Sequence, residues 1–135
     1  ASEVLPRLYL TDLFTARDEA QLTYLGITHV VSVIEHAPIL PETHSLRTLH
    51  IPLSDSSDQD ILAHLPVAIS FIHNALAEGP DSRVLVHCLM GISRSATVVC
   101  AYLIATMRMT PDEALAAVKE KRGFVSPNMG FLRQL

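Results

Sequence analysis

The sequence has no tryptophan, five glycines and only two cysteines, Cys88 and Cys100, among its 135 residues. Two cysteines cannot make a disulfide framework, so we expect a reducing compartment, the cytoplasm or the nucleus. The longest uninterrupted apolar run, at 98–105, is much shorter than the roughly 18 residues that indicate a membrane span. The formal net charge of −4 gives no overall positive field for nucleic acid or an anionic membrane, so we expect neither as a partner.

The chain does contain enough apolar material for a folded core. Hydrophobic residues make up 49% of the sequence and charged residues 18%, which is unlike the composition of disordered segments. A length of 135 residues fits a single domain over 1–135, because domains most often have about 100–150 residues. A domain of this size buries about two thirds of the surface of its extended chain, so it requires neither disulfides nor a structural metal.

Alternating strand and helix patterns predict the fold class. Short segments rich in β-branched and aliphatic residues predict strands at 7–10, 29–34, 46–53 and 83–87. Helical patterns occur between them at 18–25, closed by Gly26, and at about 60–78, closed by Gly79 and Pro80. This order predicts an α/β protein with a mostly parallel, four- to five-stranded sheet that helices flank on both faces.

The chain after the fourth strand is predicted to be helical. The segment 93–107 is apolar on nearly every side, which indicates a central buried helix. Thr110, Pro111 and Glu113 form the pattern of a capping box with proline at the first helical position, and Gly123 is expected to end that helix. A last helix is expected to begin near Pro127.

The segment 84–95, VLVHCLMGISRS, joins a buried strand to this central helix through a tight loop and carries the clearest chemical signal. A helix N-terminus presents unpaired amides, and loop amides can curl into a nest for the oxygens of an anion. Arg94 adds two parallel donors that lysine cannot copy. Cys88 lies at the strand end, where the same amides are expected to lower the pKa of its thiol and stabilise a thiolate. The residues predicted to cradle the anion are Leu89, Met90, Gly91, Ile92, Ser93 and Arg94.

This His-Cys…Arg-Ser segment and its surroundings resemble the cysteine-dependent phosphatases, specifically the small, atypical dual-specificity phosphatases. The resemblance extends almost from end to end, through the stretches 5–10, 25–30, 51–55 and 127–135. It implies the fold of that family and a two-step hydrolysis of phosphate monoesters that needs no metal or cofactor. In that reaction Cys88 attacks phosphorus to form a phosphocysteine, and Arg94 with the loop amides holds the phosphate oxygens. Phosphorylated proteins are the substrates and partners that the resemblance implies.

The leaving group of this reaction needs a proton, which implies a general acid from elsewhere in the chain. We predict Asp55, because it follows a predicted strand whose loop reaches the same sheet edge as Cys88. Its Ile-Pro-Leu-Ser-Asp context also matches the acid of the family. Asp58 and Asp60 are rivals, but Asp60 is well placed to cap the next helix and Asp58 lies in a polar turn.

Three residues are predicted to support the site. By the resemblance, the Ser95 hydroxyl eases departure of the Cys88 thiolate, and His87 orients the loop through hydrogen bonds. The alternatives are an ordinary first-turn serine and a satisfied buried histidine. Asn128 is predicted to brace the loop from the C-terminal segment, although a Pro-Asn pair in isolation is a turn signal.

Other polar side chains have simpler explanations. Lys119, Lys121 and Arg122 form a basic cluster that we expect to be a solvated face of its helix. Cys100 is expected to pack in the core rather than to form a redox pair with Cys88. The remaining histidines show no metal-ligand spacing, and solvated or core positions are expected for His29, His36, His44, His50, His64 and His73.

The loop composition bears on the substrate. Leu89, Met90 and Ile92 are neutral, and the loop has no lysine. Phosphoinositide phosphatases of the superfamily that this chain resembles usually carry lysines in this loop, so the resemblance disfavours a phosphoinositide substrate. By the resemblance, the short chain implies a shallow site that admits phosphotyrosine as well as phosphoserine and phosphothreonine. Two other functions are alternatives. One is a phosphoprotein-binding protein without turnover, and the other is a rhodanese-type sulfurtransferase, which also places a cysteine in an anion-binding loop.

Overall fold

Five strands form one sheet in a computed structural model that describes residues 1–42 and 45–135. Their order across the sheet is β1-β2-β5-β3-β4, with β1 antiparallel to β2 and the other neighbours parallel. The predicted mostly parallel sheet is therefore confirmed. His44, one of the histidines considered above, lies outside the described residues. The strands are β1 (Ser2–Leu5), β2 (Leu8–Thr11), β3 (His29–Val33), β4 (Arg47–Ile51) and β5 (Val84–His87).

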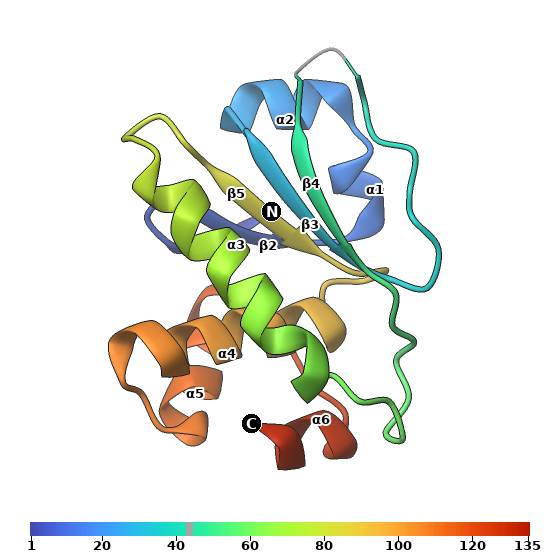
Figure 1. The fold of residues 1–135 in the computed structure, drawn as a ribbon, viewed down its shortest axis with the longest axis vertical. Coiled ribbons are helices and arrows are strands. Elements are labelled where there is room, and N and C mark those ends of the chain that lie inside the picture. Colours follow the sequence, from blue (N-terminus) through green and yellow to red (C-terminus); the bar gives the residue numbers. More distant parts are fainter. Residues whose placement is uncertain (43–44) are drawn as a thin grey trace.

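Helices cover both faces of the sheet (Figure 1). On one side lie α1 (Leu13–Ala16) and α2 (Glu19–Leu25). The other side carries α3 (Leu65–Ala77), α4 (Arg94–Met107), α5 (Pro111–Lys121) and α6 (Met129–Gln134), with the short 3-10 helix η1 (Leu62–His64) before α3. In the part of the chain that the structure describes, none of these helices combines the length and the hydropathy needed to cross a membrane.

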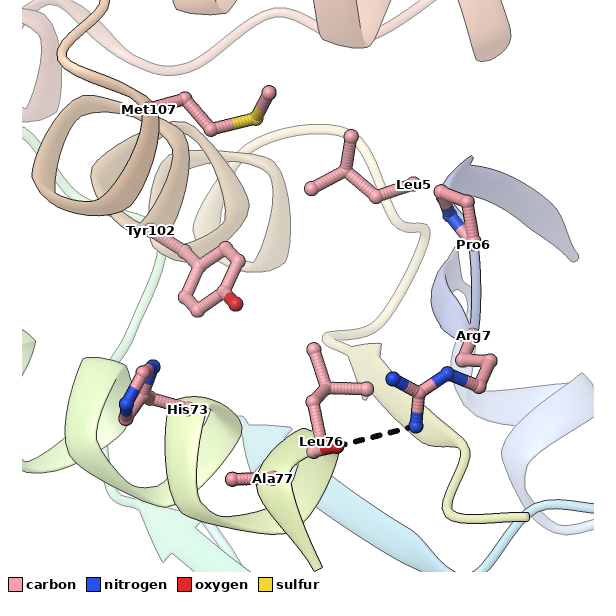
Figure 2. Close-up of a pocket in the computed structure, with 8 residues that line it drawn as sticks. All are labelled: Leu5, Pro6, Arg7, His73, Leu76, Ala77, Tyr102 and Met107. Carbon is pink, nitrogen blue, oxygen red and sulfur yellow. Dashed lines mark hydrogen bonds between the residues drawn. The ribbon is translucent and has the colours of Figure 1, made fainter. Parts of the chain in front are cut away.

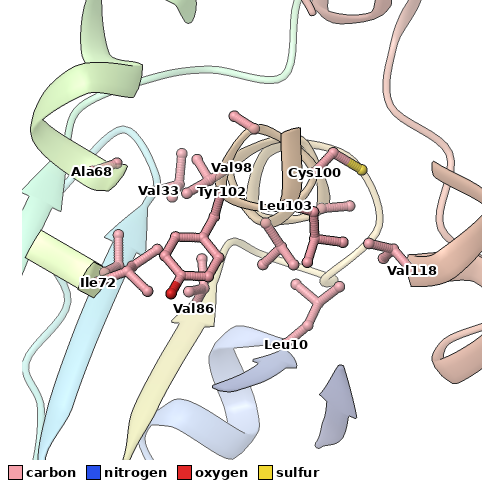
Figure 3. Close-up of a cluster of buried hydrophobic side chains, with 14 of the residues drawn as sticks. Leu10, Val33, Ala68, Ile72, Val86, Val98, Cys100, Tyr102, Leu103 and Val118 are labelled. Carbon is pink, nitrogen blue, oxygen red and sulfur yellow. The ribbon is translucent and has the colours of Figure 1, made fainter. Parts of the chain in front are cut away.

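The core is divided between these two faces because successive side chains of a strand point to opposite sides. Val31 and Val86 pack in the larger cluster under α3 to α6, whereas Val30 and Leu85 pack under α1 and α2. Each fully buried side chain of this size contributes about 1.5–3 kcal/mol, so packing on both faces stabilises the central strands β3 and β5. Figure 3 shows the larger cluster, in which α4 contributes Val98, Cys100, Tyr102 and Leu103.

Local signals set most of the helix ends. Asp18 caps α2 by accepting from the amides of Ala20 and Gln21, and Gly26 closes it in the left-handed conformation. The predicted capping box at the start of α5 is present.

The main differences from the predicted elements are short or shifted segments. Strand β1 and helix α1 were not predicted, since four residues each carry too little pattern. Helix α3 begins at Leu65 rather than near 60, because Pro66 is tolerated only in the first turn of a helix.

The carboxyl ends of the parallel strands meet at one edge of the sheet. Thr11, Ser32 and His87 are adjacent there, since Thr11 and Ser32 both pair with His87 in the strand register. The chain leaving β4 passes the same edge and leads to Asp55. Ligands of open α/β sheets bind at this edge, which places the strand-to-helix loop after β5 where a site is expected.

Candidate active site

Cys88 follows β5 directly and is only 2% exposed. Its Sγ lies 3.0 Å from the Ser95 hydroxyl and 3.3 Å from the amide nitrogen of Gly91. Burial raises the pKa of the Cys88 thiol, but hydrogen bonds from the Ser95 hydroxyl and from the amides of Ser95, Gly91 and Ile92 outweigh it, so the pKa is lowered overall. The site therefore favours a thiolate without any basic side chain in contact with the sulfur among the described residues.

The carbonyl groups of the loop are bonded to groups that do not line the pocket above the sulfur. In a trans peptide the C=O and the N–H of the next residue point in opposite directions. Because these carbonyls are bonded on the side away from the pocket, the amides that follow them point toward the pocket. The result is a ring of N–H donors around Cys88, as an anion nest requires. The partners are His87 Nδ1 for Cys88 O (2.9 Å), the Leu13 amide for Leu89 O (2.9 Å), Arg122 for Met90 O and Gly91 O (3.1 and 2.9 Å), and the Ser126 amide for Ile92 O (2.8 Å).

Gly91 is required at the bend of this loop. Its φ is +70°, a conformation that residues with a side chain rarely adopt. A Cβ at this position would lie 2.6 Å from the Thr11 carbonyl oxygen and 2.8 Å from Arg122 Nη2. A side chain at position 91 would therefore displace either the loop or the groups that hold it.

Arg94 is the first residue of α4 and is 6% exposed. Its Nη1 donates to the Leu53 carbonyl at 3.0 Å and lies 3.9 Å from a carboxylate oxygen of Glu35. Its Nε is buried, and no atom of the described residues accepts from it. Because a buried N–H without an acceptor is costly, this donor fits an anionic oxygen bound in the pocket.

His87 is fully buried at the end of β5, with both ring nitrogens in hydrogen bonds. Nδ1 donates to the Cys88 carbonyl at 2.9 Å, so Nε2 is the acceptor of the Ser32 hydroxyl at 2.7 Å. Burial is the largest cause that lowers the pKa of His87, which favours the neutral ring, and the Cys88 carbonyl, which can only accept, fixes this tautomer. The two interpretations of His87 thus hold together: it is a satisfied core histidine, and it also fixes the first carbonyl of the loop.

Asp55 lines the same pocket as Cys88 and Arg94, a cavity of about 240 Å³. Its carboxylate oxygen Oδ1 accepts from Asn128 Nδ2 at 2.9 Å. The rivals lie elsewhere, as the sequence suggested. Asp60 accepts from the Ala63 amide at the start of η1, and Asp58 accepts from the Ser56 hydroxyl within a turn.

The C-terminal segment joins the loop of Asp55 to the cysteine loop. The Asn128 amide donates to the Ser93 hydroxyl at 3.0 Å, and the Ser93 side chain makes no cap hydrogen bond with α4. Gly130 packs so tightly that a Cβ there would lie 1.9 Å from the Ser57 carbonyl oxygen. Gln134 Nε2 donates to the Gln59 carbonyl at 3.0 Å.

Comparison with known proteins shows to which family the chain belongs. Residues 8–135 match the family described as dual specificity phosphatase, catalytic domain. The chain belongs to the dual specificity phosphatase family. It is 45% identical to dual specificity protein phosphatase 26 of Bos taurus, over 100% of this chain and 65% of that protein. It is also 44% identical to dual specificity protein phosphatase 22-B of Danio rerio, over 99% of this chain and 71% of the relative.

Solved structures agree with the family and the fold. Human DUSP28 superposes with a TM-score of 0.92 at 33% identity, covering 99% of this chain and 92% of that one. The resemblance and the fold class predicted from the sequence are therefore confirmed. The chain spans 65% of the length of the bovine relative, so these matches concern the dual specificity phosphatase catalytic domain rather than the whole of that protein.

Arg122 is a residue of this dual specificity phosphatase domain that sequence reasoning missed. Lys119 and Lys121 are exposed as predicted, but the prediction of a solvated face is wrong for Arg122, which is 8% exposed. A signal was available in the sequence. Arg122 continues the i, i+4 row of Ala114 and Val118, both of which are buried, so it lies on the inner face of the chain leaving α5.

Other candidates stand apart from the phosphatase pocket. Cys100 is fully buried, and burial raises its thiol pKa to about 12, which supports packing rather than chemistry. Among the described residues no three His, Cys, Asp or Glu side chains gather as metal ligands. A cavity of about 440 Å³ lies at the opposite sheet edge, where Arg7, His73 and Tyr102 line it (Figure 2). This cavity and the pocket of Cys88 have no lining residue in common.

Proposed function

We propose that this protein hydrolyses phosphate monoesters on phosphotyrosine, phosphoserine and phosphothreonine side chains of proteins through a phosphocysteine. The observation that carries the proposal is the environment of the Cys88 sulfur. Its pKa is lowered, and it lies beneath loop amides whose peptide units are fixed by hydrogen bonds to their carbonyl oxygens. Membership of the dual specificity phosphatase family supports the same reaction. Both cysteines are free thiols, which supports the reducing setting of the cytoplasm or the nucleus.

In the first step the Cys88 thiolate attacks phosphorus, the S–P bond forms and the P–O ester bond breaks. The leaving oxygen takes a proton from Asp55. The contact from Asn128 occupies Oδ1 of Asp55, which leaves Oδ2 as the atom that carries the proton. The loop amides and the free Nε–H of Arg94 hold the other phosphate oxygens, where negative charge must be stabilised during transfer.

In the second step water attacks the phosphocysteine, and the Asp55 carboxylate takes a proton from it. The S–P bond breaks, inorganic phosphate leaves and the thiolate returns. The Ser95 hydroxyl, 3.0 Å from Sγ, donates a hydrogen bond to the departing sulfur. The same hydroxyl lowers the pKa of Cys88, and a sulfur with a lower pKa is a better leaving group.

The rim of the pocket supports a broad choice of phosphorylated side chains. Two exposed side chains that line the pocket besides Asp55 are neutral, namely Leu89 and Met90, which are 43% and 53% exposed. The cavity of about 240 Å³ and these neutral side chains support a site that takes phosphoserine and phosphothreonine as well as phosphotyrosine.

A matched panel of phosphotyrosine, phosphoserine and phosphothreonine peptides tests the proposal. We expect phosphate release from each class, and acid-quenched protein should carry a phosphoryl group on Cys88 in peptide mass spectra. Binding of phosphopeptides with no release would identify a protein without turnover. A persulfide on Cys88 after treatment with thiosulfate, again with no phosphate release, would identify a sulfurtransferase.

Asp55→Asn is expected to lower kcat for phenyl phosphate by about 10²-fold, the usual contribution of a positioned general acid. Asparagine still accepts the hydrogen bond from Asn128, so only proton transfer is lost. The loss should be much smaller with p-nitrophenyl phosphate, whose leaving group needs little protonation. The fall of kcat at high pH, where the acid has lost its proton, should disappear as well.

Asp58→Asn is the matched control because it removes a carboxylate three positions away that does not line the pocket. Its kcat and pH profile should equal those of the parent protein. If Asp55→Asn kept the rate and both limbs of the parent pH profile, the assignment of Asp55 would be wrong.

A further inference from the structure

The Arg122 side chain lies behind the cysteine loop, on the side away from the pocket. Its Nε donates to the Gly91 carbonyl at 2.9 Å and its Nη2 to the Met90 carbonyl at 3.1 Å. Nη1 donates to the Ser2 hydroxyl at 3.2 Å, and the guanidinium carbon lies 4.5 Å from the centre of the Phe124 ring. Every nitrogen of this buried guanidinium therefore has a partner.

The two carbonyls that Arg122 holds belong to two of the peptide units whose amides act on the Cys88 sulfur. Fixing Met90 O directs the Gly91 amide the opposite way, and fixing Gly91 O directs the Ile92 amide the opposite way. These two amides contribute to lowering the pKa of Cys88, and the Gly91 nitrogen is 3.3 Å from Sγ. The orientation of both peptide units thus depends on one side chain.

We propose that Arg122 is a positioning residue of the phosphatase reaction: by holding the Met90 and Gly91 carbonyls, it aims the Gly91 and Ile92 amides at the Cys88 sulfur and at the bound phosphate. This inference rests on the proposed function, in which Cys88 is the nucleophile. Arg122 does not line the pocket, so it acts through the loop and not by touching substrate.

An arginine suits this role better than any other side chain. Nε and Nη2 form a rigid fork that reaches two neighbouring carbonyls at once, whereas the ammonium of lysine is a single flexible centre. Lysine at position 122 would keep the positive charge near the sulfur while losing the fork. Arg122→Lys therefore separates the effect of geometry from the effect of charge, and Arg122→Met removes both.

The charged groups around Arg122 are few. Burial lowers the pKa of its guanidinium, while Asp12 and Cys88 act in the opposite direction. None of the described carboxylates lies within ion-pair distance of it. The carbonyl groups of Met90 and Gly91 are thus the main groups that stabilise the buried positive charge of Arg122. The position of the side chain and the conformation of the loop therefore depend on each other.

The test compares the parent protein with Arg122→Lys, Arg122→Met and the control Lys121→Met, which removes an exposed charge one residue away. Alkylation of Cys88 by iodoacetamide, mapped by mass spectrometry, is followed against pH, and kcat and KM are measured with p-nitrophenyl phosphate. We expect both Arg122 variants to move the alkylation midpoint to higher pH and to lower kcat by about 10²-fold, the usual effect of losing an oriented donor. Lys121→Met should match the parent protein in both measurements.

Thermal unfolding separates positioning from folding. If Arg122→Lys is folded and keeps the alkylation midpoint and the kcat of the parent protein, the inference is overturned. It is also overturned if kcat falls only in proportion to the folded fraction, with the midpoint unchanged. A parent protein whose Cys88 reacts like a free thiol, with a midpoint at about pH 8.5, would instead contradict the proposed nucleophile itself.

Discussion

Cys88→Ser is expected to reduce kcat for phosphate ester hydrolysis by at least about 10⁴-fold, because it removes the nucleophile. A serine hydroxyl needs an adjacent general base to become reactive. The Cys88 sulfur contacts the Ser95 hydroxyl and the Gly91 amide, neither of which can take a proton. The amide hydrogen bonds that favour a thiolate are too weak to ionise an alcohol, so steady-state kinetics should show almost no turnover.

Binding should survive this change. The Cys88→Ser protein keeps the loop amides and Arg94 in place, so calorimetry should show phosphopeptide affinity within a few-fold of that of the parent protein. Cys100→Ala is the matched control, because Cys100 is a buried thiol that does not line the pocket. Its kcat should equal that of the parent protein even if its stability falls. Substantial turnover by Cys88→Ser would refute covalent catalysis at this sulfur.

Arg94→Lys is expected to lower kcat/KM by about 10³-fold, the upper range for loss of an oriented oxyanion donor. The buried Nε–H of Arg94 has no acceptor among the described residues and is proposed to bind phosphate, while Nη1 donates to the Leu53 carbonyl at 3.0 Å. An ammonium group cannot make both contacts, so lysine loses a phosphate donor and also frees the segment that leads to Asp55. Both kcat and phosphate affinity should therefore fall.

Arg47→Lys provides the control for this substitution. Arg47 is 66% exposed and pairs with Glu78 at the surface, where exposed ion pairs contribute little. Its kcat/KM should be unchanged. An Arg94→Lys protein within a few-fold of the parent in kcat/KM would show that a point charge is sufficient at this position.

The central parts of the site could be predicted because their signals are local. A buried strand, a loop with one glycine and an apolar helix follow one another within 84–107, so Cys88 and Arg94 are placed by secondary structure alone. The position of Asp55 at this edge was predictable from the end of a strand, since parallel strands of one sheet share a carboxyl edge. Its role as the general acid was predicted also from the family resemblance of its Ile-Pro-Leu-Ser-Asp context.

The supports behind the loop could not be predicted in the same way. Ser32 and His87 form a hydrogen bond because β3 and β5 are neighbours in the sheet. No local sequence pattern predicts that strand order. The contact from Arg122 to Gly91 joins positions 31 residues apart. Helical spacing could have shown that Arg122 faces inward, but only the packing of the chain after α5 against the loop shows which carbonyls it meets.

The stretch from Leu53 to Gln59 is secured at several points, by Arg94, by Asn128, by Gln134 and by the close approach of Gly130 to Ser57. A stretch anchored in this way does not swing shut over each incoming molecule as a mobile flap does. Asp55, the proposed proton donor, is then held in position before the substrate binds. We therefore expect bond breaking, and not the motion of a flap, to be rate-limiting. In that case kcat should not fall as solvent viscosity is raised.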